Sequence, residues 1–191
     1  MACCFDWLAI ASVYDVVMPR RRPGEFLSLL EPARHDTVLE IGAGTGRIAR
    51  HYAPHVADCV LLDPSHRMLD RARRKVPLGR HVLGYAEHMP FADECFDKVV
   101  SFDSLHHWQD QARGLEEVCR VLKPEGRFFV VEVDPRTFGG RWVETMESLL
   151  RMRSRFHPPE RLVEMLRSAG LRDVTQASVG DGFTYGVMAT R

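Results

Sequence analysis

The chain has 191 residues, 45% hydrophobic and 27% charged, a composition typical of one globular domain. Basic and acidic residues number 26 each, so the net charge gives no reason to expect nucleic acid or an acidic membrane as a partner. The five cysteines are odd in number and show no CxxC spacing, which favours reduced thiols in the cytoplasm. No apolar stretch is long enough to predict a membrane span.

From Thr37 onward, short β-rich runs alternate with helical patterns, which predicts a mostly parallel sheet covered by helices. Strands are predicted at residues 37–41, 58–62, 80–83, 96–102 and 126–133. Apolar residues at helical spacing predict two helices between these strands, through Met68, Leu69, Ala72 and Val76, and through Ala112, Leu115, Val118 and Leu122.

The last third of the chain predicts one more helix and a hairpin. Pro158-Pro159 is typical of a helix start, and Gly170 of a helix end. Two β-like runs follow, at residues 174–179 and 183–189. Gly180-Asp181-Gly182 lies between them and favours a tight turn, so the two runs are predicted to pair antiparallel.

The segment Val38–Ala49 places three alternating glycines between a strand and a helix, with Glu40 just ahead of them. Glycine takes positive φ and has no Cβ, so a nucleoside-bearing cofactor can lie against bare backbone. The same letters satisfy a dinucleotide-binding fingerprint. A carboxylate at Glu40 suits the cationic methionine part of S-adenosylmethionine and would repel a pyrophosphate.

Asp63 closes the second predicted strand, where a carboxylate can accept hydrogen bonds from ribose hydroxyls of either cofactor. The alternative role is a helix N-cap, since Asp63-Pro64-Ser65 precedes a helical pattern, although Ser65 is the better cap candidate.

In several segments the chain resembles class I S-adenosylmethionine-dependent methyltransferases, within the subgroup that includes the ubiquinone and menaquinone biosynthesis methyltransferases. The segments are Val38–Ala49, Leu62–Ser65 with Met68, Gly84–Asp97, Leu105–Trp108 and Arg120–Gly126. The resemblance implies an α/β, Rossmann-like fold with a seven-stranded, mostly parallel sheet, helices on both faces and a C-terminal antiparallel hairpin. It implies S-adenosylmethionine as cofactor, S-adenosylhomocysteine as product, and a small-molecule methyl acceptor.

On this basis residues 1–191 are expected to form a single methyltransferase domain. Residues 1–36 would be a helical cover, residues 37–133 the cofactor-binding core, residues 134–170 a short acceptor-side segment and residues 171–191 the hairpin. A monomer or homodimer in the cytoplasm is expected. The alternatives are a non-catalytic S-adenosylmethionine-binding regulator or partner subunit and, less favoured, an NAD-dependent oxidoreductase.

The resemblance also implies positions for the cofactor. Its expected contacts are Glu40, Gly42, Ala43, Gly44 and Gly46 at the methionine part, Asp63 and Pro64 at the ribose, Met68, Ala86 and Glu87 at the adenine, and Ser101 at the end of the fourth strand. Where the family often has an acid before the alanine, the chain has Tyr85. The usual contact to the adenine amino group would then fall to Glu87 or be replaced by Tyr85.

Methyl transfer is an in-line displacement and needs no covalent residue; a base helps only where the acceptor must lose a proton. The candidate bases are His106 and His107, just beyond the fourth strand, with a framework role in the loop as the alternative. Tyr14 resembles a family residue that would contact the methionine end or the acceptor, or only pack. No metal site is predicted, because adjacent histidines are expected to diverge.

Overall fold

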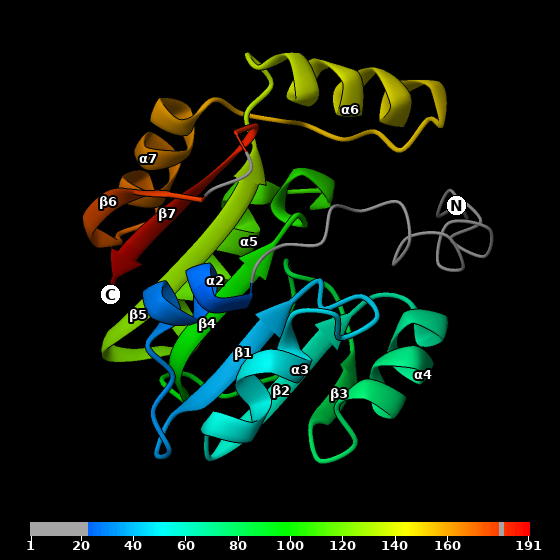
Figure 1. Cartoon of the computed structure of the whole chain (residues 1–191). Coiled ribbons are helices and arrows are strands. Elements are labelled where there is room, and N and C mark those ends of the chain that lie inside the picture. Colours follow the sequence, from blue (N-terminus) through cyan, green and yellow to red (C-terminus); the bar gives the residue numbers. More distant parts are fainter. Residues whose placement is uncertain (1–22, 180–181) are drawn as a thin grey trace.

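The computed structural model describes residues 23–179 and 182–191, so Tyr14 lies outside the described residues. Seven strands form one sheet (Figure 1). They are β1 (Thr37–Ile41), β2 (Asp58–Asp63), β3 (Arg80–Leu83), β4 (Phe96–Phe102), β5 (Leu122–Val133), β6 (Arg172–Ser178) and β7 (Thr184–Thr190).

The helices of the described residues connect these strands. They are α2 (Pro23–Leu30), α3 (Ala49–Tyr52), α4 (His66–Lys75), α5 (Gln111–Val121), α6 (Phe138–Leu149) and α7 (Pro159–Ser168), with 3-10 turns at Ala53–His55 and Leu105–His107. Among them, no helix has the length and apolar character needed to cross a membrane.

The strand order is β3-β2-β1-β4-β5-β7-β6. The first five strands are mutually parallel, and β7 runs antiparallel between β5 and β6. This confirms the predicted seven-stranded, mostly parallel sheet with a C-terminal antiparallel hairpin. The chain winds from β1 outward to β3 and then returns to the other side of β1. The carboxyl ends of β1 and β4 therefore border the crevice where ligands bind in such sheets.

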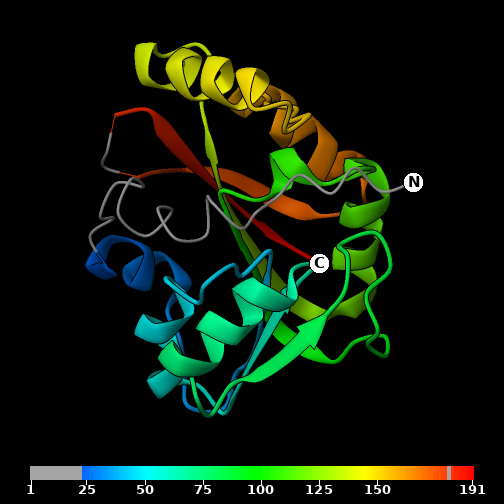
Figure 2. The same cartoon turned by 90° about the vertical axis from the view of Figure 1, so that its right-hand side faces the viewer.

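The sheet separates two apolar cores, and helices cover both faces (Figure 2). On one face, Leu115 of α5 and Leu162 of α7 pack against the strands. On the other face, Tyr52 of α3 and Leu69 of α4 do so. Helix α6 lies apart from both faces, beyond the carboxyl end of β5 (Figure 1).

The start of β5 differs from the prediction. Helical spacing assigned Leu122 to a helix and started the strand at Gly126, whereas α5 ends at Val121 and Leu122 already pairs with Phe96 of β4. The register then shifts before Arg127 pairs with Lys98, and Glu125 in between has a φ of 62°. Leu122 is fully buried, and an apolar residue suits a last helical turn as well as a first strand residue, so its apolar character could not distinguish the two.

Candidate functional site

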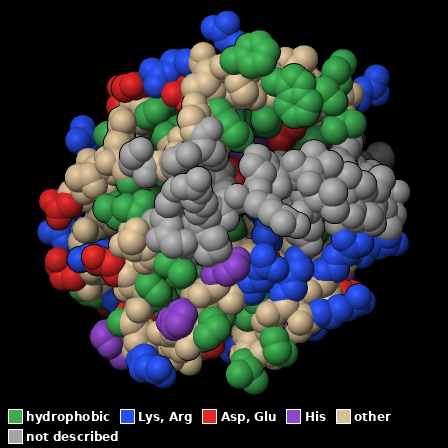
Figure 3. Space-filling model, viewed as in Figure 1, with side chains coloured by type: hydrophobic (Ala, Val, Ile, Leu, Met, Phe, Trp, Pro, Cys, Tyr) green, Lys and Arg blue, Asp and Glu red, His purple; other side chains and the backbone are tan. Residues whose placement is uncertain are grey.

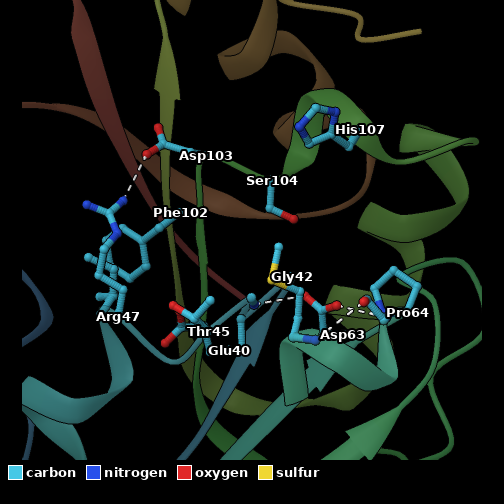
Figure 4. Close-up of a pocket in the computed structure, with 15 residues that line it drawn as sticks. Glu40, Gly42, Thr45, Arg47, Asp63, Pro64, Phe102, Asp103, Ser104 and His107 are labelled. Atoms are coloured by element: carbon cyan, nitrogen blue, oxygen red, sulfur yellow. Dashed lines mark hydrogen bonds and ion pairs between the residues drawn. The ribbon is translucent and has the colours of Figure 1, made fainter. Parts of the chain in front are cut away.

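A pocket opens at the carboxyl ends of β1, β2 and β4, where the strand order reverses (Figure 4). Three stretches of chain line it: the end of β1 with the turn that follows, the end of β2 with the first turn of α4, and the end of β4 with the loop that follows. The lining residues are Glu40, Gly42, Ala43, Gly44, Thr45, Arg47, Ile48, Asp63, Pro64, Ser65, Met68, Phe102, Asp103, Ser104 and His107.

The glycines of the turn have distinct roles. Gly42, Gly44 and Gly46 all have positive φ, of 67°, 54° and 70°. A Cβ on Gly42 would lie 1.8 Å from the Ser104 Oγ, whereas a Cβ on Gly44 would meet nothing within 4 Å. Gly42 therefore allows the turn to touch the residues after β4, and Gly44 presents bare backbone toward open space, where a ligand can approach closely.

Glu40 is a buried carboxyl group on the floor of the pocket, with 2% of its surface exposed. The Tyr52 hydroxyl donates a hydrogen bond of 2.8 Å to its Oε2. Burial raises the pKa of Glu40 to about 8, because the charged form loses its hydration. A cationic ligand group beside Glu40 would favour the ionised form instead.

Asp63 ties the end of β2 to the glycine turn. Its Oδ2 accepts a hydrogen bond of 2.8 Å from the Gly44 N–H, and its Oδ1 accepts one of 2.8 Å from the Ser65 N–H. Burial raises the pKa of Asp63 to about 6. The helix cap belongs to Ser65, whose side chain accepts from the Met68 N–H. Each Asp63 oxygen keeps a further lone pair, which leaves the carboxylate able to accept from ligand hydroxyls.

Glu132 of β5 holds the loop on the other side of the pocket. Its Oε1 accepts hydrogen bonds from the backbone N–H groups of Ser104 (3.2 Å) and Leu105 (2.8 Å). Its Oε2 lies 2.5 Å from the His106 Nδ1. The His106 ring is buried and stacks on Phe156. One buried carboxylate therefore fixes both the backbone of the loop and the orientation of His106.

The two histidines have opposite pKa shifts. Burial opposes the charge on His106, but the carboxylates of Glu132 and Glu147 outweigh it and raise the pKa of His106. Burial, together with the neighbouring His106, holds the pKa of His107 well below its usual range. His107 lines the pocket, whereas His106 lies behind it. The imidazole at the pocket is thus the one kept neutral, and the same burial makes it a weaker base than a solvent-exposed imidazole.

The two adjacent rings converge, and the expectation that they diverge is wrong. Their centroids are 4.1 Å apart, because Glu132 holds the His106 Nδ1 and the Ser154 hydroxyl lies 3.1 Å from the His107 Nδ1. The two Nε2 atoms lie 3.8 and 4.0 Å from Glu147 Oε1. One possible ligand atom from each of His106, His107 and Glu147 lies within 4.8 Å of the other two. Two imidazole nitrogens and a carboxylate oxygen have the composition that binds a divalent ion such as Zn²⁺.

Several residues predicted at the cofactor lie outside the pocket lining. Glu87 accepts hydrogen bonds from the Gln109 and Asp110 N–H groups at the start of α5. Ala86 is buried in the core, and Ser101 is buried within β4. Gly46 packs against α4, where an added Cβ would lie 3.2 Å from that of Ala72. The structure brings together the other predicted residues: Glu40, Gly42, Ala43, Gly44, Asp63, Pro64, Met68 and His107.

Several lining residues were not predicted to lie at the cofactor, among them Arg47, Asp103 and Ser104. Arg47 Nη2 lies 3.8 Å from Asp103 Oδ2, an ion pair between the turn after β1 and the loop after β4 (Figure 4). The available signal was their position in the turns that follow the two strands, at the point where the strand order reverses.

The chain is similar to several known proteins. A family described as "Methyltransferase domain" matches residues 39–130. An uncharacterised methyltransferase of Mycobacterium tuberculosis is 39% identical over 57% of this chain and 44% of its own length. A 2-methyl-6-phytyl-1,4-hydroquinone methyltransferase of Oryza sativa is 33% identical over 93% of this chain and 56% of its own length.

Among solved structures, a methyltransferase of Aquifex aeolicus described as S-adenosylmethionine-dependent has the same fold. The superposition has a TM-score of 0.76 at 18% sequence identity, and it covers 94% of this chain and 97% of the Aquifex aeolicus chain. The chain spans about half the length of the curated relatives described above.

Proposed function

We propose that the protein transfers a methyl group from S-adenosylmethionine to a small-molecule acceptor, on the premise that residues 39–130 match a family described as "Methyltransferase domain". One observation carries the proposal. Two buried carboxyl groups, on Glu40 and Asp63, line the pocket together with a glycine turn whose Gly44 faces open space.

The pocket residues fit this cofactor. Glu40 offers a carboxylate to a cationic amino acid part, and Asp63 offers one to ribose hydroxyls. A pyrophosphate beside these two carboxylates would be repelled, which disfavours a dinucleotide. Met68 at the start of α4 adds an apolar surface to the same pocket.

S-adenosylmethionine supplies an electrophilic methyl group on a positively charged sulfur, and the sulfur leaves with the bonding electrons as S-adenosylhomocysteine. The protein's task is to hold the acceptor in line with that bond. We propose that His107 takes the proton that a hydroxyl or activated carbon acceptor must lose. Its depressed pKa keeps it neutral at pH 7. His106 and Glu132 then act as positioning residues, because they orient the loop that carries His107.

The acceptor class rests on the relatives. The Oryza sativa protein, named for a methyl-phytylhydroquinone, aligns with 93% of this chain. A hydroquinone offers an electron-rich ring carbon and an acidic hydroxyl, which suits a neutral imidazole base. We therefore propose an aromatic hydroquinone as the acceptor. We also propose that the protein acts as a monomer or homodimer in the cytoplasm.

Calorimetric titration with S-adenosylmethionine, S-adenosylhomocysteine and NAD tests the cofactor. We expect saturable binding of the first two, weakened in Asp63→Ala and less so in Asp63→Asn, which keeps one acceptor oxygen for the turn. Asp70→Ala is the matched control, because Asp70 lies on the exposed side of α4 and pairs with Arg73. Binding of NAD alone would refute the proposal.

Turnover is tested with isotope-labelled S-adenosylmethionine and a set of methylated hydroquinones, catechols and amines. His107→Asn should lower kcat by about 10²–10⁴-fold while leaving cofactor binding intact, as expected for loss of a general base. Cofactor binding without methyl transfer to any acceptor in the set would contradict the assignment as an enzyme of this substrate class.

A further inference from the structure

Helix α6 has its apolar side facing outward, the reverse of a helix that packs on a protein core. Of its twelve residues it buries Gly140 and Glu147 alone. Its large apolar side chains point away from the protein, and Phe138 and Leu149 are 91% and 72% exposed. We call the exposed set the α6 stripe: Phe138, Trp142, Met146, Leu149 and the adjoining Leu150.

The α6 stripe is continuous along the helix. Phe138, Trp142 and Met146 follow one another at intervals of four residues and so lie on one helix face. Eight large apolar residues are exposed in the described part of the chain, and five of them belong to this stripe. Figure 3 shows hydrophobic side chains gathered over α6. An apolar concentration of this kind marks an interaction surface.

Exposed arginines lie within α6 and just after it. Arg141, Arg151 and Arg153 are exposed, and over residues 138–153 of the described chain the one exposed acid is Glu144. The whole protein has no net charge, so this local excess of positive charge belongs to the segment itself. Aromatic and aliphatic side chains bordered by arginine match an interface in which acyl chains lie just beneath anionic headgroups.

We propose that α6 docks flat on a lipid surface bearing anionic headgroups, with the α6 stripe among the acyl chains and the arginines at the phosphates. The buried side of the same helix places Glu147 Oε1 4.0 Å from His107 Nε2, so docking would bring the His107 side of the pocket next to the lipid. The inference does not depend on methyl transfer, because the α6 stripe lies outside the pocket lining.

Vesicle flotation of the full chain tests the proposal. We expect binding to vesicles of phosphatidylcholine mixed with phosphatidylglycerol, weaker binding to phosphatidylcholine alone, and a decrease with added salt. The double variant Phe138→Glu with Trp142→Glu should reduce binding at least about tenfold, since it removes apolar area and adds charge repelled by the headgroups. Arg151→Gln and Arg153→Gln should each reduce it roughly fivefold.

Leu78→Glu is the matched control, because Leu78 is 97% exposed and lies outside the α6 stripe. Circular dichroism and cofactor calorimetry on every variant separate loss of docking from loss of folding. Absence of vesicle binding by the folded wild type overturns the proposal. Vesicle binding that the double variant retains in full overturns it too. A third contrary result is a wild type that forms a dimer in solution without binding vesicles, if the double variant is a monomer.

Discussion

Glu40 is the group from which we expect the largest pH effect on stability. Burial raises its pKa in the folded protein to about 8 from the ordinary value of 4.5. Between these two pH values the folded chain keeps a proton on Glu40 that the unfolded chain has released. Because the folded state binds more protons, the free energy of unfolding falls as pH rises through that window. The pKa difference of about 3.5 units, at 1.4 kcal/mol each, gives an upper bound of about 5 kcal/mol.

Glu40→Gln isolates this effect. Glutamine keeps a side-chain oxygen that can accept the Tyr52 hydroxyl hydrogen bond, but it does not titrate. We expect the variant to gain stability relative to the wild type as pH rises from 4.5 to 8, by up to about 5 kcal/mol. Asp63, whose pKa is also raised, is present in both proteins, so its contribution cancels to first order.

Urea unfolding followed by circular dichroism at pH 5 and pH 8.5 measures the difference. Glu116→Gln serves as the control, because the Glu116 side chain is 59% exposed, and its stability should follow that of the wild type at both pH values. If Glu40→Gln and the wild type change by the same amount between the two pH values, the reasoning from burial is refuted.

Gly42→Ala should lower the free energy of unfolding by roughly 2–5 kcal/mol in urea titrations, since the new Cβ overlaps Ser104 at a positive φ. Gly44→Ala should cost about 1–2 kcal/mol and chiefly weaken cofactor binding in calorimetry, because its Cβ points into open space. Glu132→Gln should lower stability by about 3 kcal/mol, and amide hydrogen exchange should rise in residues 104–107. Below pH 8, S-adenosylmethionine should release a proton from Glu40, detectable as a binding enthalpy that varies with the buffer; a constant enthalpy would contradict that linkage.

The sequence predicted the strands closely because each apolar run is bounded by turn residues. Strands β1, β3 and β4 have the predicted limits, and β2 extends one residue further, to Asp63. The early start of β5 could not be predicted, because it depends on the pairing of Leu122 with a residue far away in the sequence, Phe96.

At the candidate site, local patterns indicated the residues fixed by the turn after β1 and by the end of β2. They could not indicate the role of Glu87, whose carboxylate accepts hydrogen bonds from backbone N–H groups just before α5. They also could not show that Glu147 of α6 lies near His107, since the two are forty residues apart. Contacts between segments distant in sequence depend on how α6 and the loop after β4 pack together.

The near absence of buried residues in α6 has a consequence for how this protein can change over evolution. Substitutions on its outer side leave both cores intact, so they cost little folding stability. The turn after β1, in contrast, tolerates few changes, because Gly42 and Ser104 touch across it. Substitutions on the outer side of α6 can therefore change the surface on which this helix docks while the pocket floor stays the same.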